Sequence, residues 1–366
     1  MRRGGVRSRA GISGGGRGTP FARGTGMPTA TRDVTVVMVP RQRFSFARRA
    51  LENLFAQTGP CRLVYVDAGS PPPLRRWLES EAGRRGFRLL RSDAYPSPNE
   101  ARNLGLPEVD TEYVVFVDND VLVAPGWLTP LVRCAEEMGA WIAGPLDCIG
   151  EPVFRTIHMA GGVLHFEDRR GGRRLIDHHW LSNQPLALYR GDLVREPCEF
   201  VEFHTMLVRR DVFDRVGPLD EALLSTPEHL DLCLLVRAAG GSVWFEPESV
   251  VNYVPATRLR HGDARFYMLR WSERWNRASL AHFKRKWDIV GDDPFLAGHH
   301  MWLTDKRMLV LGPAWRAAQR ALGWRGSRAS AVAFERIATR FLRPDERDRI
   351  RARPAVPRRA ASAPAP

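Results

Sequence analysis

Two carboxylates separated by one residue, Asp118 and Asp120, directly follow an apolar segment at 113–117. Together they can hold a hard divalent cation against phosphate oxygens, because Mg²⁺ and Mn²⁺ both take carboxylate and phosphate oxygens as ligands. Such an ion neutralises the charge that develops on a departing phosphate group. The same triplet is also compatible with a simple turn, in which an aspartate side chain bonds to nearby backbone. The elements predicted around the triplet are needed to distinguish a metal site from a turn.

Strand and helix patterns alternate around this triplet. Continuous apolar, β-branched runs predict strands that are buried on both faces at 34–39, 63–66 and 113–117. Helical spacing between the runs predicts a mostly parallel α/β sheet with helices on both faces. Ligands of such sheets bind beyond the carboxyl ends of the strands. Asp67 follows the second run, so we expect Asp67 and the triplet at one edge of the sheet.

Composition divides the 366-residue chain into four parts. An Arg- and Gly-rich tail at 1–32 has no periodicity and is expected to be disordered. The α/β domain occupies 33–255, a basic, Trp-rich helical extension follows at 256–342, and a second disordered tail is expected at 343–366.

Charge and cysteine content restrict the class of protein. The net charge of +14 favours polyanionic partners, although much of the excess lies in the tails. Five scattered cysteines without a CxxC pair favour reduced thiols in a cytoplasmic setting. The N-terminus has no apolar core of a signal peptide, and no apolar run is long enough to span a membrane. Peripheral contact with the cytoplasmic face of a membrane is compatible with these features.

Four separated features occur in an order that resembles family 2 glycosyltransferases of the GT-A fold. They are the strand at 34–40, Asp67, the segment 99–105, and the acidic triplet. The resemblance covers about residues 33–255. It implies a GT-A fold and transfer of a sugar from a nucleotide-sugar to a hydroxyl acceptor, such as a glycan or a lipid. It also implies a divalent cofactor, Mn²⁺ or Mg²⁺.

The first two features are expected to bind the nucleoside. The resemblance places Pro40 and Arg41 near the nucleoside and gives Asp67 a hydrogen bond from the base. For Asp67, the alternative is a cap at the start of the next helix.

The other two features are expected near the diphosphate. The resemblance implies that Arg102 contacts the diphosphate or sugar and that Asn103 shapes the same loop. Asp118 would contact the ribose or sugar, or share the metal with Asp120, which would be the principal ligand. An ordinary surface ion pair is the alternative for Arg102.

A later segment should supply the catalytic base. Where the family commonly has an acidic pair, one further residue and Asp-Leu, this chain has Glu228, His229 and Asp231. In an inverting transfer the base removes the proton of the acceptor hydroxyl while the oxygen attacks the sugar from the far side. Glu228 is the first choice and His229 the second. Asp231 either takes part or only orients the helix.

Further ligands are less certain from the sequence. The family's later metal-binding histidine falls at 250–253, which contains none, and His261 is the nearest candidate. Glu202 and His204 are expected either to line the acceptor site or to be buried structural groups. Three other histidines show no spacing typical of metal ligands: His158, His178 and His179.

A second hypothesis comes from the basic, aromatic tract at 264–288. Such a tract can bind nucleic acid or a membrane surface, so the chain could be a binding protein on an inactive GT-A scaffold. The commoner explanation is amphipathic helices that bury their aromatic side chains. We therefore expect an inverting glycosyltransferase without a specific nucleic-acid partner.

Overall fold

The computed structural model describes residues 33–92, 94–169, 172–260 and 262–289, and short stretches at 298, 306–310, 312, 316–317 and 319–323. Both expected tails, His261 and most of the expected extension after residue 289 lie outside these described residues. None of the helices within them is long and apolar enough to cross a membrane.

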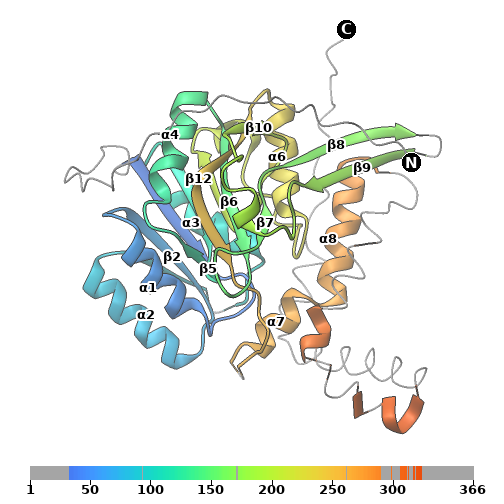
Figure 1. Ribbon diagram of the computed structural model, residues 1–366. Helices are drawn as coiled ribbons and strands as arrows, with labels where there is room; N and C mark the ends of the chain where they lie inside the picture. Colours follow the sequence, from blue (N-terminus) through green and yellow to red (C-terminus); the bar gives the residue numbers. More distant parts are fainter. Residues whose placement is uncertain are drawn as a thin grey trace.

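A ten-stranded sheet forms the centre of the molecule (Figure 1). Its main strands are β1 (Val34–Val39), β2 (Arg62–Ala68), β3 (Arg88–Ser92), β4 (Tyr113–Asp118), β6 (Ile142–Ile149), β10 (Glu196–Cys198), β11 (Thr205–Arg209) and β12 (Val243–Tyr253). They lie in the order β10-β12-β6-β11-β4-β1-β2-β3. Two short strands complete the sheet: β5 (Val121–Val123) pairs with β12, and β7 (Ile157–Met159) pairs with β6.

The expected mostly parallel sheet is confirmed. Strands β1 to β4 run in one direction, and β6 and β12 share it. Strand β11 lies between β4 and β6 and is antiparallel to both, with Thr205 opposite Val117. Because β11 runs the other way, its first residues lie at the same sheet edge as the last residues of β4.

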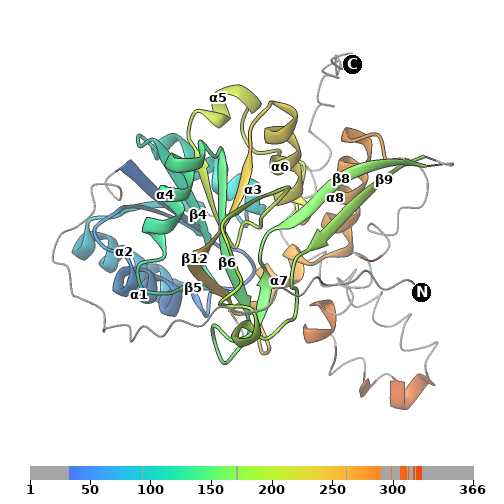
Figure 2. The same ribbon diagram turned by 45° about the horizontal axis from the view of Figure 1, so that its top comes forward.

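Helices cover both faces of the sheet, as expected for a GT-A fold (Figures 1 and 2). Helices α1 (Ala47–Gln57), α2 (Pro72–Arg85) and α4 (Leu128–Met138) pack on one face. Helices α3 (Pro98–Gly105), α5 (Val212–Val216) and α6 (Glu228–Ala238) pack on the other. The continuous apolar runs follow from this arrangement, because neighbouring residues such as Val36 and Val37 enter opposite cores. Two short 3₁₀ helices span Leu106–Glu108 and Leu186–Leu188.

The remaining elements lie to one side of the sheet. Strands β8 (Gly162–Arg169) and β9 (Gly172–His179) form a hairpin that projects from the body beside α8 (Glu273–Lys286) in both views (Figures 1 and 2). The rings of Phe166 and Trp287 connect the hairpin to the end of α8, with centroids 5.7 Å apart.

The aromatic side chains of the basic tract point into the protein. In α7 (Ala264–Arg270) and just after it, Phe266 and Trp271 are fully buried, and Phe283 of α8 joins the core that contains α6. This confirms the expectation that amphipathic helices pack their aromatic residues inward. The domain boundary near residue 255 stays a prediction.

Candidate functional site

Asp118, the last residue of β4, is held by two arginines from different segments. Arg102 of α3 donates from Nη2 to Oδ1 of Asp118 at 3.0 Å. Arg41, which follows β1, donates from Nη1 to Oδ2 at 3.2 Å. The side chains of Asp118 and Arg102 are each only 1% exposed, so the surface ion pair considered for Arg102 is wrong. The structure brings these three predicted site residues into direct contact.

The arginines and carboxylates at this edge shift one another's pKa values. Burial raises the pKa of Asp118 and Asp120 adds to the rise, whereas Arg102 and Arg41 oppose it. Burial alone would lower the pKa of Arg41, but the surrounding acidic groups outweigh it and raise that pKa. The planar guanidinium groups of arginine bind phosphate oxygens in pairs. Two of them beside a buried carboxylate form a site that suits a diphosphate.

The other two residues of the triplet contact the segment that follows β1. Asn119 accepts a hydrogen bond from the backbone N–H of Arg41 at 3.2 Å and donates to the carbonyl of Arg43 at 2.9 Å. Gln42 donates from Nε2 to Oδ2 of Asp120 at 2.8 Å. The second oxygen of Asp120, Oδ1, is buried without a hydrogen-bond partner among the described residues. A cation would satisfy that oxygen.

Asp67 lies at the same edge, at the end of β2. It accepts hydrogen bonds from the backbone N–H of Ser70 at 3.1 Å and from Nη1 of Arg91 at 3.0 Å. Burial raises its pKa despite these contacts. Helix α2 starts after Pro71 and has no side-chain cap, so the alternative of a helix cap for Asp67 is wrong. Asp67 is two strands away from Asp118, or about 10 Å.

Pro40 and Asn103 are the chain neighbours of Arg41 and Arg102. Pro40 is buried directly after β1. Asn103 of α3 accepts from the backbone N–H of Leu219 at 3.1 Å and donates to its carbonyl at 2.9 Å. Its observed contacts therefore hold the segment that leads towards α6. Asn103 lies in a helix, so the expected loop at this segment is wrong. The predicted roles of both residues at the nucleotide-sugar stay predictions.

Glu228, the first residue of α6, reaches the arginines of the site. Its Oε1 lies 3.1 Å from Nη2 of Arg270 and 4.0 Å from Nη1 of Arg102. Burial alone would raise the pKa of Glu228, but Arg270 and Arg102 outweigh it, so the pKa is lowered. Oε2 is buried and has no hydrogen-bond partner among the described residues. Glu228 is thus an ionised carboxylate with one oxygen available.

The other two base candidates differ in their surroundings. The ring of His229 is stacked with that of Phe200, and burial lowers its pKa to about 4, so the imidazole is neutral at pH 7. Asp231 accepts from Nζ of Lys286 at 2.7 Å and from Nε1 of Trp287 at 2.8 Å. These contacts match the orienting alternative for Asp231, because they attach α6 to the end of α8.

Glu202 and His204 belong to a cluster that the sequence pattern did not indicate. Ligand atoms of Asp147, His158, Glu202 and His204 all lie within 4.8 Å of one another. Asp147 lies on β6 and His158 on β7, while Glu202 and His204 precede β11. The antiparallel pairing of β7 with β6 brings His158 beside Asp147. Spacing along the chain missed this group, because its members come from three segments that only the sheet unites.

The cluster and the triplet meet at Tyr253. The rings of His204 and Tyr253 are stacked with centroids 4.2 Å apart, and the guanidinium of Arg41 lies 4.9 Å from the Tyr253 centroid. The Tyr253 hydroxyl is 2.8 Å from Nε2 of Gln42, which also binds Asp120. Tyr253 thus occupies the stretch where the family's later metal-binding histidine was expected.

A lysine from a distant part of the chain also lies near this edge. Nζ of Lys306 is 6.0 Å from the ring centroid of Tyr253 and 5.9 Å from that of Trp271. Burial and Arg41 lower the pKa of Lys306 to about 8, although Asp120 and Glu202 oppose them. No motif in the sequence pointed to Lys306, whose position depends on packing against α7.

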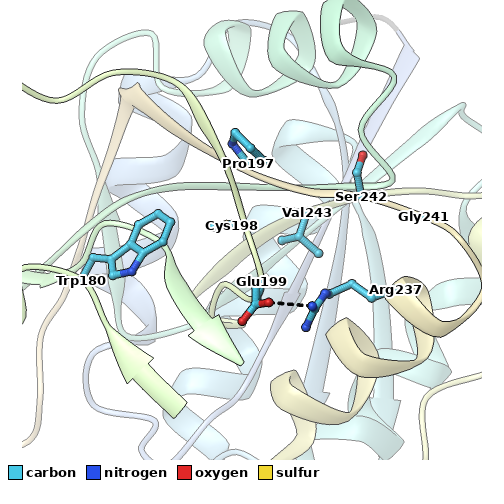
Figure 3. A pocket seen from close by; sticks show the side chains of 8 residues that line it. All are labelled: Trp180, Pro197, Cys198, Glu199, Arg237, Gly241, Ser242 and Val243. Carbon is cyan, nitrogen blue, oxygen red and sulfur yellow. Dashed lines mark hydrogen bonds and ion pairs between the residues drawn. The ribbon is translucent and has the colours of Figure 1, made fainter. Parts of the chain in front are cut away.

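A separate pocket of about 320 Å³ lies near β10 and the start of β12 (Figure 3). Glu199 and Arg237, which form an ion pair at 2.7 Å, lie at its wall (Figure 3). None of the predicted site residues lines this pocket. The sheet edge with the acidic triplet is therefore the stronger candidate for the active site.

Comparison with known proteins identifies the class. A sequence profile of Glycosyl transferase family 2 matches residues 35–217, which is half of the chain. The chain belongs to this family. Its doubly covered, mostly parallel sheet confirms the expected GT-A fold.

Several curated proteins are similar to this chain. It is 28% identical over 265 residues to the uncharacterized protein y4gI of Sinorhizobium fredii, a match that covers 69% of this chain and 27% of that protein. It is 29% identical over 243 residues to the pre-mycofactocin glycosyltransferase of Mycobacterium tuberculosis, covering 64% and 45%. It is 27% identical over 193 residues to human polypeptide N-acetylgalactosaminyltransferase 15, covering 50% and 28%. The chain thus spans less than half the length of each relative.

Among solved structures, the chain is similar to one titled "Crystal structure of GalNAc-T7 with UDP, GalNAc and Mn2+". The TM-score is 0.49 at 17% sequence identity, and the match covers 63% of this chain and 44% of that one.

Proposed function

We propose that this glycosyltransferase transfers a sugar from a nucleotide-sugar to a hydroxyl acceptor by a single displacement that inverts the anomeric centre, with help from a divalent metal ion. One observation carries the proposal. The buried Asp118 is paired with both Arg41 and Arg102 at the sheet edge where one carboxylate oxygen of Asp120 has no partner among the described residues.

The nucleotide-sugar would lie along this edge from β2 to β4. Asp67 would accept a hydrogen bond from the base, since its carboxylate is fixed by Ser70 and Arg91. Arg41 and Arg102 would bind the diphosphate, for which charge-assisted hydrogen bonds to guanidinium groups are well suited. Asp118 holds both arginines in place and would contact the ribose or sugar.

The metal ligands present fit Mn²⁺ or Mg²⁺. Asp120 offers a buried carboxylate oxygen, and Gln42 fixes the orientation of that carboxylate. A divalent ion bound there would stabilise the negative charge on the departing nucleoside diphosphate. The remaining ligands would be diphosphate oxygens and water, as is usual for such ions.

Glu228 would act as the base for the acceptor hydroxyl. Its Oε1 is held by Arg270 and its Oε2 is buried without a partner in the part of the chain that the structure describes, so one oxygen is positioned to accept a proton. The contact with Arg102 places Glu228 beside the proposed diphosphate site. His229 is the alternative base, because its imidazole is neutral at pH 7.

A thermal-shift screen tests the class of substrate. Each nucleotide-sugar is added to the purified chain with Mn²⁺, with Mg²⁺ or with chelator, and the melting temperature is recorded. A ligand that binds the folded state raises the melting temperature, so we expect a shift for at least one nucleotide-sugar that depends on the metal. Salt-sensitive RNA binding with no nucleotide-sugar shift would instead support a binding protein on an inactive scaffold.

A further inference from the structure

The cluster of Asp147, His158, Glu202 and His204 is built from two buried and two half-buried groups. The side chains of His204 and Asp147 are 1% and 6% exposed, and those of Glu202 and His158 are 12% and 20% exposed. Two carboxylates and two imidazoles from β6, β7 and the start of β11 therefore converge in the interior. Burying charged groups is costly unless they are paired or bind a metal.

These groups lie closer together than the ligands of a bound metal ion would. Nδ1 of His204 lies 2.6 Å from Oδ2 of Asp147 and 3.0 Å from Oε2 of Glu202. Nε2 of His158 lies 3.3 Å from the same Glu202 oxygen. Ligands about 2.0–2.2 Å from a tetrahedral ion are about 3.3–3.6 Å apart. Outward shifts of less than about 1 Å would open the cluster around an ion.

Hydrogen bonding within the cluster leaves polar atoms unsatisfied. Nδ1 of His204 carries at most one proton, yet it faces carboxylate oxygens of both Asp147 and Glu202. Oδ1 of Asp147 and Nε2 of His204 are buried and have no hydrogen-bond partner among the described residues. A divalent cation between the side chains would be a common partner for both carboxylates, and Oδ1 would then be free to act as a second ligand atom of Asp147.

We propose that Asp147, His158, Glu202 and His204 form a binding site for one first-row transition-metal ion, separate from the metal that Asp120 would share with a diphosphate. Two imidazoles with two carboxylates suit Zn²⁺ and also accept Mn²⁺, whereas Mg²⁺ prefers an all-oxygen octahedron. Two carboxylates balance the charge of the ion. His179, whose Nε2 lies 3.7 Å from Oε1 of Glu202, would orient that carboxylate.

The position of this site suggests what the ion does. It would tie β6, β7 and the start of β11 together where β11 meets β4. The ring of His204 supports Tyr253, whose hydroxyl reaches Gln42 and through it Asp120. The ion would therefore hold the wall beside the triplet in place, without taking part in diphosphate binding.

The test measures metal binding without any nucleotide. Chelator-treated protein is titrated with Zn²⁺, Mn²⁺ and Mg²⁺ by calorimetry, and metal content is determined after gel filtration. We expect one Zn²⁺ or Mn²⁺ per chain and no binding of Mg²⁺. Replacing the partly exposed ligand, His158→Gln, should weaken Zn²⁺ binding at least tenfold. Two control variants, His165→Gln and Asp120→Asn, should bind Zn²⁺ like the wild type.

Three results would overturn the proposal. They are a wild type that binds neither Zn²⁺ nor Mn²⁺, a His158→Gln variant with unchanged affinity, and loss of binding in Asp120→Asn alone. If His158→Gln does not fold, the wild type loaded with Mn²⁺ still tests whether histidine binds the ion. Pulsed electron paramagnetic resonance detects ¹⁴N coupling from an imidazole bound to Mn²⁺. Absence of that coupling contradicts the site. The outcome is independent of the proposed transfer reaction, since no sugar or nucleotide is present.

Discussion

The backbone N–H of Asp118 donates to the carbonyl oxygen of His204 at 3.1 Å, which joins the end of β4 to the beginning of β11. Through this contact the acidic triplet and the cluster around His204 share one edge of the sheet. The two groups are chemically different. Carboxylates and arginines suit a metal-bound diphosphate, whereas the imidazoles suit a tightly held transition metal. The candidate site therefore has one side built from carboxylates and arginines and a neighbouring wall built from imidazoles and carboxylates.

The variant Asp120→Asn should remove the metal dependence of transfer. The side chain keeps its size and its contact with Gln42, but the charge that binds the ion is lost. We expect kcat/KM to fall about 100-fold or more, because a catalytic metal contributes several kcal/mol. Steady-state kinetics across a series of Mn²⁺ concentrations measures the effect. The matched control, Asp110→Asn, changes an exposed aspartate paired with Arg62 and should behave like the wild type. Equal turnover in both variants would refute the role of Asp120.

Loss of Arg102 should cost both stability and binding. In Arg102→Ala the buried carboxylate of Asp118 loses one of its two cations and Glu228 loses a neighbour. Removing one partner of a buried ion pair costs about 3–5 kcal/mol in the free energy of unfolding. Urea denaturation measures that change, and calorimetry should show weaker nucleotide-sugar binding. The exposed Arg84→Ala, which removes an ion pair with Glu81, should change stability by less than about 0.5 kcal/mol. A similarly small effect for Arg102→Ala would contradict the structure.

Glu228→Gln should slow the chemical step and leave binding nearly intact. Removing a general base typically lowers kcat by about 10²–10⁴, while the KM for the nucleotide-sugar should change little. Because the pKa of Glu228 is lowered, wild-type kcat should fall only as the pH drops below the ordinary glutamate pKa of 4.5. Kinetics of His229→Gln, which should keep most of the activity, decides between the two bases. The reverse pattern would assign the base to His229.

Acid stability should depend on the contact of Asp220 with α8. Burial alone would raise the pKa of Asp220, but His282 and Lys286 outweigh it and hold the pKa well below its usual 3.8. A lowered pKa in the folded state stabilises the protein above pH 3.8, and this contribution is lost as the pH falls towards the lowered value. Asp220→Asn should therefore be less stable than the wild type at neutral pH. The difference should shrink in acid, as measured by urea denaturation across that pH range. A difference independent of pH would show that the ion pairs contribute nothing.

Much of the sheet edge that carries Asp67 and the acidic triplet could be predicted from local patterns. The β-branched runs before Asp67 and Asp118 form buried strands because both faces of each strand are covered by helices. Parallel strands bring their carboxyl ends to a common edge, which places both aspartates there without further information. Arg102 follows from the resemblance of the segment 99–105 to the family, and the structure adds that its partner is Asp118.

The other side of the site could not be predicted in the same way. Asp231 looked like a catalytic candidate, but Lys286 and Trp287 of a later segment hold both of its oxygens. The spacing of residues along the chain predicts only which side chains share a face of one helix or strand. The contacts of Asp231 join elements about fifty residues apart.

The α/β class, the family and the edge at which Asp67 and the acidic triplet lie could be predicted from the residues alone, because periodicity and strand-end residues are local properties. The antiparallel direction of β11 between β4 and β6 is seen only in the folded chain, and it places His204 beside Asp118 and Asp147. Strand direction depends on which strands pair and in which register. The pairing and register of the strands depend on the packing of the whole sheet, so the residues around His204 do not indicate them.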